Sequence, residues 1–180
     1  AIYYVLRYDF KVLKIVKESN SIFSIYITGK NVERFEYESG QYAVFRFLSK
    51  GFWYESHPFS FSVNRNSNYL RISFKKTSGD FTNKMPSIQP GSRVLIDGPR
   101  GAFIANRCAS KVVYLIAGGV GITPFRAMIP DFIKKNKKVV LIYSAESIRE
   151  MAYYSYFKQL NDQKEITFIA YETNKNNYLN

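Results

Sequence analysis

The sequence predicts an all-β unit followed by an α/β unit, that is, an antiparallel β-barrel or sandwich and then a parallel sheet with helices. From Phe10 to about Ile96, short β-rich segments alternate with polar turns. From Gly98 the order becomes strand, helix, strand, helix, strand, which is typical of right-handed βαβ connections. We therefore expect a barrel domain over residues 1–106 and an α/β domain over residues 107–180.

Six segments are the expected strands of the barrel. They are rich in β-branched and aromatic residues, and the third alternates apolar with polar positions around Arg46. Polar runs such as residues 64–68 separate them, and this regular spacing favours a closed or nearly closed antiparallel sheet. The segments are residues 12–16, 21–28, 42–48, 59–63, 69–74 and 94–96.

The second unit is expected to contain three parallel strands and two helices. The strands are predicted at residues 112–117, 138–143 and 165–171, and the helices at about 123–136 and 147–160. Residues 104–110 are expected to form a linker, and the polar residues 173–180 a disordered tail.

The first strand of the α/β unit, residues 112–117, is apolar throughout, as expected of a fully buried parallel strand. Three strands are half of a doubly wound sheet, and this strand would lie at its open edge. We therefore expect further chain after residue 180, and the start at Ala1 similarly suggests a piece of a larger protein.

Composition excludes several classes of function. With one cysteine, Cys108, and one histidine, the sequence offers no spacing for a zinc or iron–sulfur site, and a reducing compartment is the natural setting. No run approaches the roughly 20 apolar residues that span a bilayer, so the chain itself is expected to be soluble.

The net charge of +12 is spread over both units, and its densest run, residues 134–138, falls at a predicted helix end. This pattern disfavours a nucleic-acid reader and suits phosphate-bearing cofactors or an anionic surface.

Residues 117–125, AGGVGITPF, are the strongest local motif. A buried strand ends directly at Gly118, Gly119 and Gly121, and Thr123 with Pro124 then carries the chemistry of a helix start. Such a turn exposes backbone N–H groups to a phosphate, although a plain strand-to-helix turn remains the alternative because the spacing differs from G-x-G-x-x-G. A second loop, TSGDFTNKMP at residues 77–86, leads into one helical turn and offers a similar anion site or an ordinary capped turn.

Four motifs in this order resemble the ferredoxin–NADP reductase superfamily, and within it the dehydrogenase part of ferric reductases and NADPH oxidases. They are HPFSFS at residues 57–62, the Gly-Asp-Phe-Thr loop at 79–82, DGPRGAF at 97–103 and AGGVGITPF at 117–125. The resemblance covers nearly the whole chain. It implies that the barrel binds FAD and that the α/β domain binds NAD(P)H.

By position in these motifs, the resemblance also implies roles for single residues. Phe59 would flank the flavin ring, Ser60 would act at the flavin N5, and Thr123 would lie near the nicotinamide. His57 would lie close to the ribityl or pyrophosphate portion, with Pro58 as a further cofactor-binding residue, and Ser144 would lie beside the adenosine ribose. From the residues alone, a histidine beside a strand and an aromatic core position are the preferred interpretations of His57 and Phe59. The other implied FAD ligands are Ser73, Lys75, Gly79, Asp80, Phe81 and Thr82, and the other implied coenzyme ligands are Gly118, Gly119, Val120, Gly121, Ile122 and Pro124.

The resemblance implies an FAD-dependent NAD(P)H oxidoreductase that passes hydride to the flavin and then single electrons to a haem or another acceptor. Its partner would be a membrane-embedded haem domain that precedes Ala1, with this module on the cytoplasmic face of the membrane. A soluble reductase with a separate acceptor and a flavin- or nucleotide-binding subunit without turnover are the alternatives. The residues do not decide between NADH and NADPH, because Arg149 would suit a 2′-phosphate and Glu146 a free ribose.

Overall fold

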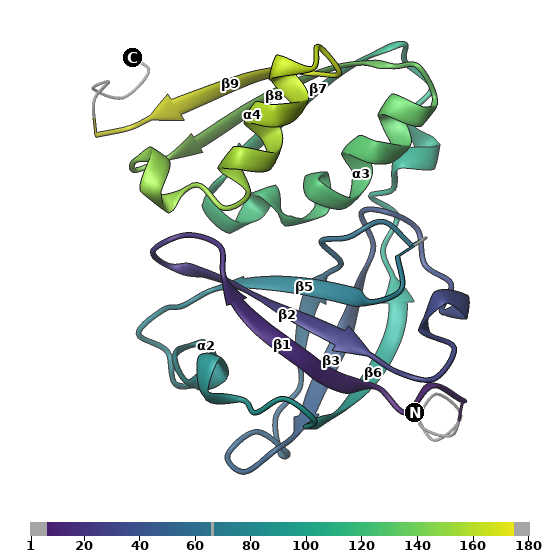
Figure 1. Cartoon of the computed structure of the whole chain (residues 1–180), viewed down its shortest axis with the longest axis vertical. Helices are drawn as coiled ribbons and strands as arrows, with labels where there is room; N and C mark the ends of the chain where they lie inside the picture. The colour runs from purple at the N-terminus through teal and green to yellow at the C-terminus, as the bar shows by residue number, and fades with distance from the viewer. Residues whose placement is uncertain (1–6, 66, 175–180) are drawn as a thin grey trace.

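The computed structural model describes residues 7–65 and 67–174, which form a β-barrel and a parallel α/β unit stacked on it (Figure 1). The barrel strands form one six-stranded sheet in the order β4-β3-β6-β1-β2-β5, in which every pairing is antiparallel. A bridge between Phe61 and Ile72 joins the two edges and closes the barrel. The strands are β1 (Lys11–Lys17), β2 (Ile22–Thr28), β3 (Tyr42–Leu48), β4 (His57–Ser60), β5 (Leu70–Lys75) and β6 (Arg93–Arg100).

Alternating side chains fill the barrel. Along β3, Ala43, Phe45 and Phe47 are fully buried, whereas Arg46 faces solvent. The ring of Phe45 meets that of Phe61 edge-on at 5.8 Å. Each buried phenylalanine contributes roughly 1.5–3 kcal/mol to stability. The many aromatic residues of the first unit therefore supply much of the apolar burial that stabilises the barrel. Short helices lie in the connections: η1 (Val32–Arg34), α2 (Asp80–Lys84), η2 (Met85–Ser87) and η3 (Ala105–Arg107).

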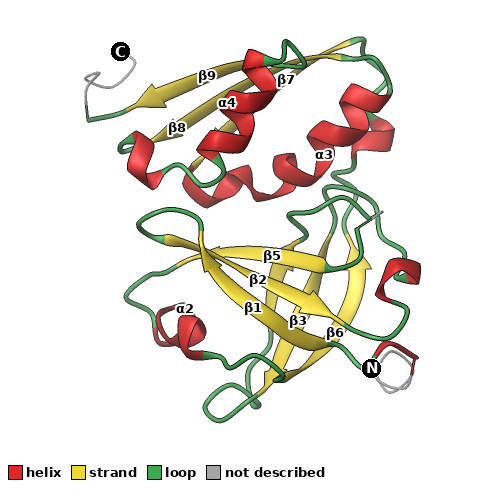
Figure 2. Ribbon diagram, in the orientation of Figure 1, coloured by secondary structure: helices red, strands yellow, loops and turns green. Residues whose placement is uncertain are grey.

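The second unit is a parallel sheet of order β7-β8-β9. Helices α3 and α4 lie between this sheet and the barrel (Figure 2). Helix α3 forms because Phe125, Met128, Ile129 and Phe132 recur at helical spacing and are all buried. The elements are β7 (Val112–Gly118), η4 (Gly119–Ile122), α3 (Thr123–Lys134), β8 (Lys138–Ala145), η5 (Ile148–Glu150), α4 (Tyr154–Asp162) and β9 (Thr167–Glu172).

The predicted fold class is confirmed, whereas several details were wrong. Strand β7 is not buried throughout: it lies at the edge of the sheet, and Tyr114 and Ile116 are 69% and 72% exposed. Within the described residues, both helices cover the same face of the sheet, so alternate residues of β7 face solvent.

The second predicted helix begins later than expected. Tyr153 has a φ of +61°, which a residue within an α-helix cannot have, so α4 starts at Tyr154 and only the 3₁₀ turn η5 precedes it. In the barrel, β4 spans 57–60 rather than 59–63, and η3 occupies part of the expected linker. Thr173 and Asn174 donate backbone hydrogen bonds to Ala145 and Glu146, and residues 175–180 of the expected tail lie outside the described residues.

In the described part of the chain, no helix is both long and apolar enough to span a membrane. Nor do the described residues contain a group of three or more His, Cys, Asp or Glu side chains that would hold a metal ion.

Two buried tyrosines should make the protein sensitive to alkali. Burial raises the pKa of Tyr37 in the barrel and of Tyr143 in the α/β unit. An unfolded chain ionises these phenols near their usual pKa of about 10, so above that pH unfolding releases protons and stability falls by about 1.4 kcal/mol per pH unit per tyrosine.

We therefore predict that Tyr37→Phe makes the free energy of unfolding less steeply dependent on pH above about pH 10. Urea unfolding at a series of pH values checks this. Tyr54→Phe is the matched control, because Tyr54 is exposed. Identical slopes for wild type and Tyr37→Phe would contradict the prediction.

Candidate functional site

Strand β5 carries one row of side chains that faces the α/β unit. Arg71, Ser73 and Lys75 alternate along it and so point to the same side of the sheet. Arg71 and Ser73 are each 4% exposed, whereas Lys75 is exposed. The row therefore runs beneath the second domain and emerges at Lys75.

Ser73 belongs to a buried cluster of hydroxyl groups at the domain interface. Its Oγ bonds the Oγ of Ser62 at 3.0 Å, the Oγ of Ser24 at 2.8 Å and the hydroxyl of Tyr153. Ser24 also bonds the Tyr153 hydroxyl at 2.8 Å. Ser24, Ser62 and Ser73 come from the barrel and Tyr153 from the α/β unit, so this hydroxyl cluster joins the two. The structure thus places the Ser73 side chain in the interface, two residues before Lys75 on the same strand.

Beside the hydroxyl cluster lies a cavity of about 190 Å³ between the domains, here called the coenzyme cavity. It brings together Lys75 from the predicted flavin residues and Gly119 from the predicted coenzyme residues. Ser144 precedes its wall residue Ala145 and pairs with Gly118 in the parallel sheet. The full lining is Ser21, Ile22, Lys75, Gly119, Ala145, Glu146 and Glu150.

The glycine turn after β7 has the open backbone that a phosphate group requires. A Cβ atom added at Gly118, Gly119 or Gly121 would meet no atom within 4 Å, so the backbone borders free space. Gly119 also has a φ of +50°, a left-handed conformation that favours glycine. Helix α3 begins directly after the turn, which directs its N-terminal dipole to the same side.

Other predicted residues of this turn stabilise it by hydrogen bonding within the turn or by packing against the core. The Thr123 hydroxyl donates to the carbonyl of Val120 at 2.6 Å, and Thr123 is 4% exposed. Ile122 is fully buried, and Val120 packs partly against the same core. Pro124 occupies the first turn of α3. Thr123 and Ile122 therefore shape the turn, and the glycines present its surface.

Tyr143 of β8 is a positioning residue that the sequence did not reveal. Its buried hydroxyl donates to the carbonyl of Gly119 at 3.0 Å and accepts a bond from the backbone N–H of Ala152 at 3.1 Å. In the sequence, a tyrosine within an apolar strand is typical of a core residue. Only the hydrogen bond to Gly119 in the structure shows that Tyr143 positions the glycine turn.

On the barrel, β4 carries its predicted residues along the edge of the sheet. Phe59 is half-buried, with its ring 6.2 Å from Phe45 and 6.4 Å from Phe74, and Pro58 is exposed. Ser60 is half-buried two residues before Ser62, so both hydroxyls project to the side where Ser62 joins the hydroxyl cluster. Ser60 therefore lies on the interface side of the barrel.

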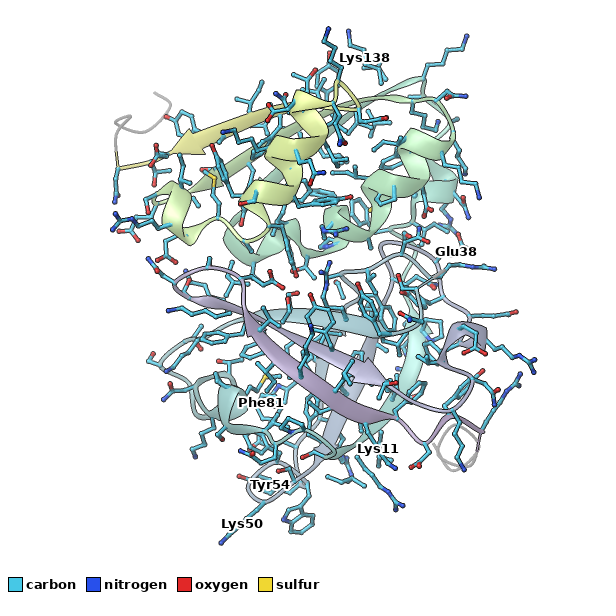
Figure 3. All side chains as sticks on the ribbon, in the orientation of Figure 1. Lys11, Glu38, Lys50, Tyr54, Phe81 and Lys138 are labelled. Carbon is cyan, nitrogen blue, oxygen red and sulfur yellow. The ribbon has the colours of Figure 1, made fainter. Side chains whose placement is uncertain are left out.

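The remaining predicted residues surround α2 on the flank of the barrel. The His57 ring stacks on Phe81 at 3.7 Å, and His57 Nε2 lies 3.0 Å from the Glu55 carboxylate. Thr82 bonds Thr77 at 2.7 Å, and a Cβ at Gly79 would meet nothing closer than 3.5 Å. Figure 3 shows Phe81 on the part of the barrel away from the α/β unit. A ligand that contacts both the residues around α2 and the α/β unit must therefore be extended. The side chain of Asp80 lies outside the described part of the structure.

Comparison with known proteins decides the family. A family described as FAD-binding domain matches residues 7–103, and one described as oxidoreductase NAD-binding domain matches residues 115–178. The chain belongs to the ferredoxin–NADP reductase superfamily.

Two solved structures share the fold. A flavohem-like FAD/NAD-binding domain of nitric oxide dioxygenase from Vibrio cholerae has a TM-score of 0.80 at 24% identity, covering 91% of this chain and 73% of that one. A ferredoxin–NADP⁺ reductase from Neisseria gonorrhoeae, with bound FAD and NADP, has a TM-score of 0.78 at 21% identity, covering 94% and 71%.

Among curated relatives of this superfamily member, a flavohemoprotein of Candida albicans is 32% identical over 91% of this chain and 43% of its own length. A flavohemoprotein of Oceanobacillus iheyensis is 31% identical over 87% and 41%. The chain thus spans less than half the length of these relatives.

The residues fit the cofactors of the superfamily. The open glycine turn suits a pyrophosphate, and half-buried Phe59 and Ser60 offer an aromatic face and a hydroxyl at the barrel edge. The barrel is the FAD-binding domain, and the α/β unit binds NAD(P)H.

We predict that Tyr143→Phe weakens NAD(P)H binding. Loss of the hydroxyl leaves the Gly119 carbonyl and the Ala152 N–H without their partner, at a cost of about 1–3 kcal/mol. We expect a lower melting temperature and a several-fold higher KM for the coenzyme, with FAD binding unchanged. Tyr114→Phe, on the exposed side of β7, is the control. An unchanged KM in Tyr143→Phe would remove the positioning role.

Proposed function

We propose that this chain is the reductase module of a larger flavoprotein, which takes electrons from NAD(P)H and delivers them singly to a haem. The observation that carries the proposal is the coenzyme cavity, in which Lys75 of the flavin domain and Gly119 of the coenzyme domain line one space. A transfer between two cofactors requires that both domains contribute to one site.

In this proposal, the chain's own residues bind the two cofactors and orient them. When bound, FAD supplies the chemistry that accepts two electrons together and releases them one at a time. The glycine turn holds the coenzyme phosphates by backbone N–H groups, and Lys75 adds a positive charge beside them. Phe59 offers an apolar surface to the flavin ring, and Ser60 a hydroxyl that hydrogen-bonds its reactive edge.

The proposed acceptor is a haem because two curated relatives are named flavohemoproteins. These relatives are more than twice as long as the segment they share with this chain, which leaves room for a haem-binding part. That part would lie in the same polypeptide, either as a soluble domain or as a membrane-embedded one of the ferric reductase type. We place the module in the cytoplasm, where NAD(P)H is available and its one cysteine stays reduced.

We predict that the FAD-loaded protein loses its absorbance at about 450 nm when NAD(P)H is added without oxygen. Ser60→Ala should retain FAD and be reduced about tenfold more slowly, because one hydrogen bond of about 1.4 kcal/mol is lost at the reacting edge. Stopped-flow absorbance measures both rates. Ser110→Ala, an exposed serine, is the matched control.

One outcome would contradict the proposal, and another would remove only the role of a single residue. Bound FAD that NAD(P)H does not bleach would support a binding subunit without turnover. An unchanged rate in Ser60→Ala would remove the role of that hydroxyl and leave the module's activity intact.

We further predict a preference for NADH. Glu146 and Glu150 line the coenzyme cavity just after β8, and a carboxylate there repels the 2′-phosphate of NADPH. Glu146→Gln should therefore raise kcat/KM for NADPH about tenfold and leave that for NADH nearly unchanged. Glu165→Gln, exposed at the opposite end of the sheet, is the control. Equal changes with both coenzymes would contradict this assignment.

A further inference from the structure

A second cavity between the domains has no part in the proposed electron transfer. It has a volume of about 520 Å³, within the range of small-molecule sites. Its walls come from the β1–β2 hairpin, β5, the first turn of α3 and the start of α4, and we call it the arginine cavity. It is lined by Glu18, Arg71, Arg126, Ile148, Arg149, Met151, Tyr153, Tyr154, Ser155 and Tyr156.

The arginine cavity carries an excess of positive charge. Three of its residues are arginines, and Glu18 is the one acidic residue among those that line it. Arg71 is held by the barrel: its Nε donates to Ser62 at 3.0 Å, a terminal nitrogen donates to Tyr26 at 3.3 Å, and the other donates to the Ser62 carbonyl. Arg71 is also buried, so its positive charge is shielded from water.

Arg126 is held less completely. Its guanidinium lies 3.5 Å from the centre of the Tyr156 ring, but its buried Nε has no hydrogen-bond partner among the described residues. Burial lowers the pKa of Arg126, and Tyr156 offsets this only in part. A buried donor without a partner costs about 1–3 kcal/mol.

An unmatched acceptor lies in the same cavity. Oε1 of Glu18 is buried and has no hydrogen-bond partner within the described chain. The walls of the cavity thus contain a cationic residue and an anionic residue that do not satisfy each other. A ligand that fits both must carry negatively charged oxygen atoms for the arginines and an O–H or N–H donor for Glu18.

We infer that the arginine cavity binds a phosphate group, most favourably that of a small aromatic phosphomonoester. A phosphate oxygen accepts from the guanidinium of Arg126, and a protonated phosphate oxygen donates to the carboxylate of Glu18, whereas an ionised carboxylate ligand has no proton to donate. Tyr153, Tyr154 and Tyr156 line the remaining space and suit an aromatic ring.

The arginine cavity is separate from the coenzyme cavity. The tip of the β1–β2 hairpin lies between them, with the Asn20 N–H bonded to the Arg149 carbonyl at 3.1 Å and the Ser21 hydroxyl bonded to Glu150 at 2.5 Å. Arg71 and Glu18 come from the barrel, and Arg126 and Tyr156 from the α/β unit. A ligand there contacts both domains and stabilises their arrangement.

The test uses the full-length protein loaded with FAD, so that the flavin phosphate site is filled. Phenyl phosphate and inorganic phosphate are titrated separately by calorimetry. We expect both to bind and phenyl phosphate to bind more tightly; equal affinities would identify free phosphate as the ligand and overturn the aromatic part of the inference.

Two variants should change phosphate affinity in opposite directions. Arg126→Gln should weaken it at least about tenfold, because the charge-assisted donor is lost. Glu18→Gln should strengthen it several-fold, because an opposing negative charge is removed and an amide donor is gained. Lys158→Gln, which removes one exposed charge from α4, is the matched control and should leave the affinity unchanged.

Circular dichroism melting curves and flavin content establish that each variant is folded. Binding that survives Arg126→Gln but is lost in Lys75→Gln would locate the phosphate in the coenzyme cavity and overturn the inference. So would weaker binding in Glu18→Gln, or no binding of either ligand to the wild-type protein.

Discussion

The arrangement of the site depends on one buried polar contact, the hydroxyl cluster of Ser24, Ser62, Ser73 and Tyr153. Each of its hydrogen bonds adds only about 0.5–1.5 kcal/mol of net stability, but an unmatched hydroxyl in this buried position costs about 1–3 kcal/mol. The cluster is satisfied only in one orientation of the α/β unit on the barrel. The cluster therefore adds little net stability to the interface. Its main effect is to determine which residues face each other across the coenzyme cavity.

The sequence predicted what is encoded locally. Alternation along β3, helical spacing along α3 and the glycine turn after β7 all lie in the expected places, because each pattern is fixed by neighbours within a few residues. What the sequence did not reveal depends on contacts between distant segments. Ser73 resembles any strand serine until Tyr153, eighty residues later, is packed against it. Tyr153 itself interrupts the predicted second helix: its backbone is left-handed, and its hydroxyl bonds Ser24 and Ser73 of the barrel.

The coenzyme side of the site is made mainly from backbone. Gly118, Gly119 and Gly121 face open space, while Thr123 and Tyr143 hold the carbonyls of Val120 and Gly119 from below. This arrangement leaves free space beside the backbone of the turn, so an anion can approach it without displacing a side chain. The motif identifies the glycines, and the structure adds that the Thr123 hydroxyl is bonded within the turn.

Strand β5 connects the two cavities between the domains. Arg71 lines one, Lys75 lines the other, and Ser73 between them bonds Tyr153. The hairpin tip that separates the cavities contributes Glu18 to the first and Ser21 to the second. Each cavity is formed by both domains, so a ligand in either favours the same orientation of the two. Thermodynamic linkage then requires that a phosphate ligand in the arginine cavity and the coenzyme strengthen each other's binding by the same factor, to the extent that both bind this orientation better than any other.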